Sequence, residues 1–176
     1  MSGPAEVVSA IQAMVAGVAD VATDPAERIR LLTALATVSV PAGGNTGLAA
    51  VGRRVALAAL TRAAASCPLG SYEDAEALRT GVCGLLVEEE TAAADGGEDE
   101  VVGALRALRE AVDRDLRRRG ADLSPLRSVE VKANLPALVL AHRLYGDATR
   151  APEMTRMAGD PPNPLFMPER FRALAR

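Results

Sequence analysis

The chain has 176 residues, of which 49% are hydrophobic and 24% are charged, and its formal net charge is −3. A chain of this length and polarity buries enough apolar surface to fold without a metal ion or a disulfide. Only 2% of the residues are aromatic, so Ala, Leu and Val must fill the core, which favours closely spaced helices. The composition therefore predicts one or two globular domains that are mainly α-helical.

The sequence predicts neither a secretion signal nor a membrane span. The first residues lack a basic segment followed by a long apolar run. The uncharged stretch 31–52 is broken by Pro41 and two glycines, so a loop between two helices explains it better than a bilayer crossing. Cys67 and Cys83 show no metal-ligand spacing, and we expect them to be ordinary buried thiols of an intracellular protein.

Charge is distributed unevenly along the chain. Residues 1–100 hold 6 basic and 14 acidic side chains, whereas residues 101–176 hold 14 basic and 9 acidic side chains. Such asymmetry can direct the basic half toward an acidic partner or a neighbouring subunit. The alternative interpretation is that the two halves complement each other within one molecule.

Apolar residues recur at helical spacing in the first third of the chain. The spacing predicts a helix over 4–20 and a second helix that begins after the N-cap candidate Asp24 and stops at Pro41. A third helix is predicted over 45–66. Together these segments favour an antiparallel Ala/Leu-rich helical bundle.

Two further helices complete the predicted bundle, which extends over residues 1–121. Ser71 is placed to cap the fourth helix, and Asp74 follows three residues later, close to a capping-box pattern. The segment 88–100 is acidic and broken by glycines, which predicts a solvated loop. A fifth helix follows this loop and ends in an arginine run before Gly120.

The arginine run has two interpretations. Basic side chains in a last helical turn stabilise the negative end of the helix dipole, so capping is the main expectation. A phosphate-binding patch is the alternative, although nucleic-acid recognition normally adds a recognisable fold or interleaved aromatic residues. The side chains that would form the patch are Arg114, Arg117, Arg118 and Arg119.

After Pro125 the periodicity changes from that of a helix to that of a strand. Residues 126–132 alternate between apolar and polar, as in a half-buried strand. Two short helices, a proline-rich loop and a returning strand within 166–174 follow. This strand, helix, helix, strand order (βααβ) predicts a small α+β module over residues 122–176 with the outline of a LysM-like module.

The chemistry of the chain argues against catalysis. The one histidine, His142, lies beside Arg143 without a second metal ligand or an acid partner at helical spacing, so we expect a structural or surface role. No phosphate-binding loop and no paired carboxylates are recognisable, so no catalytic residue, cofactor or metal is predicted. Tyr145 and Phe166 have two interpretations, packing in the core of the small module or contact with a ligand.

Several segments resemble the C-terminal half of the DNA circularisation protein family of Mu-like phages, which is also described as a tail or baseplate component. The resemblance extends over about residues 45–176. The sequence differs from the family pattern in three ways: the family's separate N-terminal domain has no counterpart, a family-type Asn is replaced near Gly159, and a family-type Gly pair is replaced by Glu169 and Arg170. The segments that carry it are 71–79, 104–109, 113–116, 119–123, 135–150 and 163–168.

The resemblance implies a structural protein of a phage or phage-like tail, made in the bacterial cytoplasm and assembled into the virion. Its implied partners are tube, hub, tape-measure and baseplate proteins, and it is expected to be oligomeric in the particle. Two alternatives stay open: a LysM-type module that binds peptidoglycan glycan strands, and a DNA-end-binding protein that uses the arginine run. Nucleic acid is the less favoured partner, and no membrane contact is expected.

Overall fold

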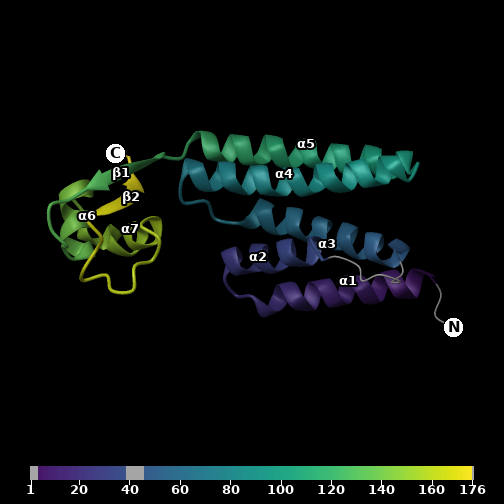
Figure 1. Ribbon diagram of the computed structural model, residues 1–176, viewed down its shortest axis with the longest axis horizontal. Helices are drawn as coiled ribbons and strands as arrows, with labels where there is room; N and C mark the ends of the chain where they lie inside the picture. Colours follow the sequence, from purple (N-terminus) through teal and green to yellow (C-terminus); the bar gives the residue numbers. More distant parts are fainter. Residues whose placement is uncertain (1–3, 39–45, 176) are drawn as a thin grey trace. The chain divides into compact units, whose positions relative to one another are not determined.

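The computed structural model describes residues 4–38 and 46–175 (Figure 1). The chain divides into two compact units. We call Met1–Leu69 together with Ala75–Arg119 the helical unit, and Gly70–Asp74 together with Gly120–Arg176 the small unit. The described part of the chain is mainly helical and contains one two-stranded antiparallel sheet, so the prediction of a mainly α protein is confirmed.

Within the described residues the helical unit contains five helices, and the last two lie side by side as an antiparallel pair (Figure 1). Their core contains buried aliphatic side chains such as Leu32, Leu60, Leu86 and Leu116. Small Ala and Leu side chains let neighbouring helices pack closely, as the composition predicts. The helices are α1 (Pro4–Val21), α2 (Pro25–Ala36), α3 (Thr46–Ser66), α4 (Tyr72–Asp95) and α5 (Asp99–Ala121).

Two predicted N-caps are confirmed. A carboxylate oxygen of Asp24 accepts a hydrogen bond from the Glu27 amide at 3.2 Å at the start of α2, and the Ser71 hydroxyl accepts one from the Asp74 amide at 3.1 Å at the start of α4. The second helix ends at Ala36, earlier than predicted. Pro41 and Asn45, at which boundaries were predicted, lie outside the described residues.

The predicted loop over 88–100 is wrong for most of its length. Helix α4 continues to Asp95, and the chain reverses within a few residues at Gly96 and Gly97. Gly97 has φ of +71°, a conformation that favours glycine. Three of the acidic side chains that suggested a solvated loop, Glu89, Glu90 and Glu98, instead pair with arginines, and Glu89 is 5% exposed.

The small unit has the predicted order strand, helix, helix, strand. Strands β1 and β2 pair antiparallel, with Leu126 opposite Leu174 and Glu130 opposite Arg170. Gly146, with φ of +74°, ends the first helix in the left-handed conformation. The elements are β1 (Leu126–Glu130), α6 (Ala137–Tyr145), the 3-10 turn η1 (Ala148–Arg150), α7 (Ala151–Met157) and β2 (Arg170–Leu174).

The core of the small unit differs in chemistry from that of the helical unit. Leu140, Met154, Met167 and Phe171 are each at most 5% exposed and pack in one cluster. Large, adaptable side chains suit a unit with few layers, because each must fill more space.

Residues 70–74 belong to the small unit although they are remote from it in sequence. The Tyr72 amide donates to the Ser124 carbonyl at 3.3 Å, and the Leu126 amide donates to a Glu73 carboxylate oxygen at 2.8 Å. A Cβ atom at Gly70 would lie 2.5 Å from the terminal methyl of Met157, so a larger residue there would require the flexible Met157 side chain to move. The segment thus completes the small unit beside the start of β1.

Among the described helices, none combines the length and the apolar character that a bilayer crossing requires.

Candidate functional site

An open groove of about 660 Å³ lies on the small unit. Its lining includes Pro136 and Leu138 at the start of α6, Pro164 and Leu165 of the loop before β2, and small side chains of η1 and the first turn of α7. Arg156 is among the polar lining residues. The groove is therefore mainly aliphatic, with a few polar groups at its margin.

Two backbone hydrogen bonds join the start of α6 to the loop before β2. The Ala137 amide donates to the Pro164 carbonyl at 2.8 Å, and the Met167 amide donates to the Leu135 carbonyl at 3.1 Å. Pro136 occupies the N-cap of α6 with extended backbone angles, so the missing proline N–H leaves no orphan donor there. These bonds fix the loop before β2 against the start of α6.

The loop between α7 and β2 is shaped by its own short-range contacts. Gly159 and Asp160 have φ of +85° and +48° and turn the chain after α7. The Asn163 side chain then accepts the Leu165 amide at 3.0 Å, and its carbonyl accepts the Phe166 amide at 3.0 Å. This turn leaves Leu165 and Phe166 mainly in solvent, 58% and 62% exposed.

Several large apolar side chains of the small unit are left in contact with water. Leu138 is 58% exposed and Val139 is 39% exposed, although both belong to a helix whose opposite face packs into the core. Exposed apolar side chains grouped beside a groove mark interaction sites more often than isolated ones do. Leu138 and Leu165 both line the groove and form what we call its leucine rim.

Two charged side chains that line the groove have no ion-pair partner. Arg156 and Asp160 are exposed, and neither forms a salt bridge with any residue within 4–38 or 46–175. Nearby charges behave differently, since Arg150 pairs with Glu153 at 2.7 Å. The groove thus offers one positive and one negative group to a partner.

The hydroxyl groups of the groove are already used as donors. The Thr149 hydroxyl donates to the Asp147 carboxylate at 2.6 Å, and this hydrogen bond lowers the pKa of Asp147. The Thr155 hydroxyl donates to the Ala151 carbonyl at 2.8 Å. A ligand in the groove would therefore meet these oxygens as acceptors.

The two aromatic residues singled out by the sequence are in different environments. Phe166 is mainly exposed, so core packing is wrong for it, and Phe171 fills that role. Tyr145 packs against the core cluster of the small unit, and the Arg150 guanidinium lies 4.2 Å from the centre of its ring. Burial raises the pKa of the Tyr145 hydroxyl, and the nearby Leu174 backbone lowers it by a smaller amount. The buried hydroxyl forms no hydrogen bond with the described residues.

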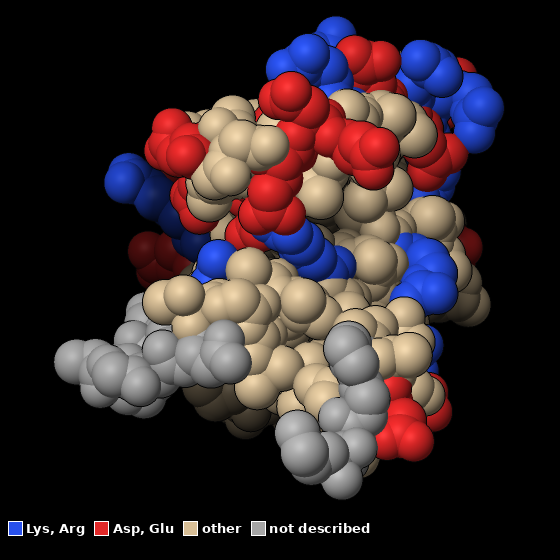
Figure 2. Space-filling view, turned by 90° about the vertical axis from the view of Figure 1, so that its right-hand side faces the viewer, with Lys and Arg blue, Asp and Glu red and all other residues tan. Residues whose placement is uncertain are grey.

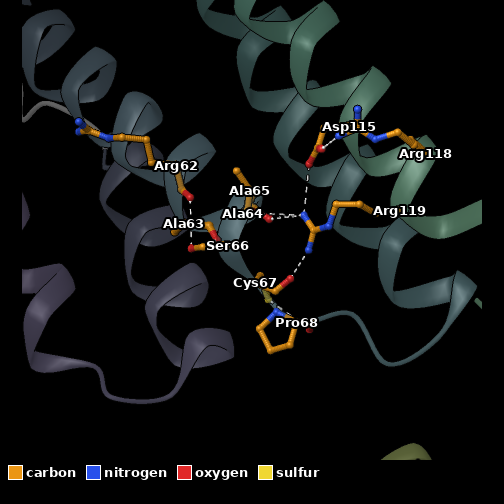
Figure 3. A network of polar contacts seen from close by, with 10 residues as sticks. All are labelled: Arg62, Ala63, Ala64, Ala65, Ser66, Cys67, Pro68, Asp115, Arg118 and Arg119. Atoms are coloured by element: carbon orange, nitrogen blue, oxygen red, sulfur yellow. Dashed lines mark hydrogen bonds and ion pairs between the residues drawn. The ribbon is translucent and has the colours of Figure 1, made fainter.

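The arginine run of α5 is largely engaged within the helical unit (Figure 3). The Arg119 guanidinium donates to the carbonyls of Ala64 and Ala65 at 3.0 and 3.1 Å, and also to that of Cys67. Arg119 therefore caps the end of α3 rather than that of its own helix. The other side chains differ in pairing: Arg117 meets Asp113 at 3.0 Å, Arg118 meets Asp115 at 2.7 Å, and Arg114 is exposed without a described ion pair.

Opposite charges of the two halves of the chain meet inside the helical unit. Glu90 of α4 pairs with Arg106 and Arg109 of α5 at 2.8 and 3.3 Å. The hydrogen bond from Arg106 lowers the pKa of Glu90. Figure 2 shows acidic and basic side chains interleaved over α4 and α5, with mostly uncharged surface below them. Intramolecular complementarity thus accounts for part of the charge asymmetry.

The remaining titratable candidates do not converge. His142 is exposed on α6, and Cys67 and Cys83 are not joined in a disulfide. Burial raises the pKa of the Cys83 thiol, which keeps it protonated at neutral pH. Over the described residues, no group of three His, Cys, Asp or Glu side chains is arranged to hold a metal ion.

None of the residues that line the groove was predicted as a site residue. The available signal was in 137–145, where Leu138 and Val139 are apolar although they lie off the stripe formed by Ala137, Leu140 and Ala141. An apolar residue on the solvent face of an amphipathic helix indicates a contact surface.

No protein-family model matches the chain, and comparison with curated proteins finds no match. The family resemblance described above stays a prediction.

Proposed function

We propose that this protein is a non-enzymatic structural component of a phage or phage-like tail. It acts through protein–protein contacts at the junction of tube, hub and baseplate. In this proposal the small unit is a LysM-like module used as a docking block, and the helical unit is its scaffold.

One observation carries the proposal: the segments with the most specific family resemblance contribute much of the groove lining. Residues 135–150 supply Pro136, Leu138 and Ala148, and residues 163–168 supply Pro164 and Leu165, whereas Arg156 and Asp160 lie outside these segments. Within these segments Leu138, Leu165 and Phe166 are each more than half exposed. A surface of exposed apolar side chains beside a recess suits burial against another protein.

The proposed function is tested by co-expressing the full chain with tube, hub and tape-measure proteins of a phage tail. We expect the chain to co-purify with at least one of them. Leu165→Asp should reduce the recovered partner severalfold, whether the groove contacts the tail protein directly or joins two copies that bind it together, because a buried interface tolerates an unpaired carboxylate poorly. The matched control is Val87→Asp, a half-exposed residue of α4 in the helical unit. Failure of the wild-type chain to capture any of these proteins would remove the proposal's basis.

A peptidoglycan glycan strand is the second candidate, because the groove is open and its threonine oxygens can accept hydrogen bonds. The lining residues include no aromatic side chain on which a sugar ring could stack. Retention on purified sacculi, competed by chitooligosaccharide, would favour this function over tail assembly.

A further inference from the structure

The groove combines features that are complementary to each other. It presents a cation, Arg156, and an anion, Asp160, and neither is paired with another residue in the part of the chain that the structure describes. It also presents two exposed leucines, Leu138 and Leu165, beside a recess whose lining includes small side chains such as Ala148. A partner that matched all of these features would carry an anion, a cation and protruding apolar side chains in the same arrangement.

We propose that the occupant of this groove is the same groove of a second copy of this chain, an inference that rests on the proposed assembly function. In an interface with two-fold symmetry, each contact between two residues occurs twice with the roles of the copies exchanged. Arg156 of one copy then faces Asp160 of the other, and Asp160 of the first faces Arg156 of the second. The leucine rim of each copy packs into the recess of the other.

Charge complementarity favours a second copy over other occupants. A uniformly acidic partner would leave Asp160 facing like charge, and a basic partner would do the same to Arg156. A neutral glycan would leave both groups without a counter-charge and both rim leucines without apolar contact. A second copy pairs both charges and covers both leucines at once.

The test is a charge-reversal experiment on the full chain, read by sedimentation equilibrium over a range of concentrations. Wild-type protein should dimerise. Arg156→Glu and Asp160→Lys should each weaken dimerisation by about tenfold or more, because each substitution removes two ion pairs and introduces repulsion. An equal mixture of the two variants should restore association, since one copy then carries two anions and the other two cations.

Arg143→Glu is the matched control, because Arg143 is an exposed residue of α6 that does not line the groove. It should dimerise like the wild type. Asp160 has a positive φ, so a lysine there is strained. If this variant loses its tyrosine circular dichroism, Leu138→Arg replaces it and should abolish association.

Three results would overturn the inference: a wild-type chain that stays monomeric, reversal variants that dimerise as tightly as the control, or a mixture that fails to restore association. Retention of monomeric chain on sacculi would assign the groove to glycan instead. A monomer that still captures tail proteins would overturn this inference and leave the proposed function standing. A groove-dependent dimer that captures none of the tail proteins would overturn the proposed function and leave the dimer inference standing.

Discussion

The helical unit and the small unit differ in how they use part of their charged residues. In the helical unit, charged side chains join one helix to another, as Glu89 does with Arg53 and Arg54 at 3.0 and 2.8 Å. In the small unit, Arg150 pairs with Glu153, but Arg156 and Asp160 form no ion pair with any described residue and lie in a groove with exposed leucines. Groups that are paired internally stabilise a scaffold, whereas exposed groups without a counter-charge are available to a partner. The contrast supports the proposal that the small unit binds the partner.

The two units can be followed separately because all four aromatic residues lie in the small unit. Tyr72 belongs to the segment Gly70–Asp74, and the other three, Tyr145, Phe166 and Phe171, follow residue 120. Near-ultraviolet circular dichroism of tyrosine therefore reports the small unit, whereas the far-ultraviolet helix signal comes mainly from the long helices of the helical unit.

The largest expected effect is a core truncation made once in each unit. Met154 and Leu86 are both fully buried, so Met154→Ala and Leu86→Ala should each cost about 2–5 kcal/mol. A unit of about 60 residues has only about 3–9 kcal/mol of stability, so Met154→Ala should remove most of the tyrosine signal at moderate temperature. Leu86→Ala should shift only the far-ultraviolet transition. A single shared transition for both variants would refute the independence of the units.

A smaller effect is expected at the buried carboxylate of the helical unit. Glu89→Ala leaves Arg53 and Arg54 without their shared partner, which should lower the free energy of unfolding by about 2 kcal/mol. The cost stays below that of a fully buried pair because both arginines are partly exposed and can turn to water. Urea unfolding followed in the far ultraviolet measures this change. Glu89→Gln, which keeps one hydrogen-bond acceptor but loses the charge, should cost less, and equal costs would show that an uncharged acceptor contributes nothing at this position.

Two neighbouring arginines, Arg118 and Arg119, distinguish the stability gained from helix capping from that gained from a surface ion pair. Arg119→Ala removes the donors to three carbonyls at the end of α3 and should cost about 1–2 kcal/mol. Arg118→Ala removes one exposed ion pair and should cost less than about 0.5 kcal/mol. Thermal unfolding compares the two. Equal costs would contradict the assignment of Arg119 as the cap of α3.

The smallest effect is a pH dependence, for which we predict a direction. Hydrogen bonds from Arg54 and Arg79 lower the pKa of Glu98 and Asp113 in the helical unit. A depressed folded-state pKa contributes stability that is present above the unfolded-state pKa and is lost as pH falls through the folded value. Below about pH 4.5 the helical unit should therefore lose stability progressively. Melting curves between neutral pH and about pH 3 test this, and a melting temperature that does not fall would contradict it.

The sequence predicted features that depend on local chemistry and missed those that depend on packing. Asp24, Ser71 and Gly146 act at helix ends through their own side chains or backbone freedom, and their roles were predictable. The acidic segment at 88–95 is predicted as a loop because its arginine partners lie on other helices, on α3 for Glu89 and on α5 for Glu90. Its alanines and glutamates favour helix once those partners are in place.

The groove was missed for the same reason. Part of its lining comes from the start of α6 and part from the loop before β2. These two segments are distant in sequence and are joined by the backbone hydrogen bonds at Ala137 and Met167. Arg119 was expected at the end of its own helix, yet its contacts lie across the unit on α3. Periodicity describes which face of a helix is buried, but it does not identify the neighbouring element.

Oxidative footprinting of the full chain in its free and associated forms tests the central claim that the groove of the small unit is the docking surface. We predict that Leu138 and Leu165 lose reactivity on association, whereas Val87, a half-exposed side chain of the helical unit, keeps it. Protection of Val87 with unchanged reactivity at both groove leucines would contradict the claim.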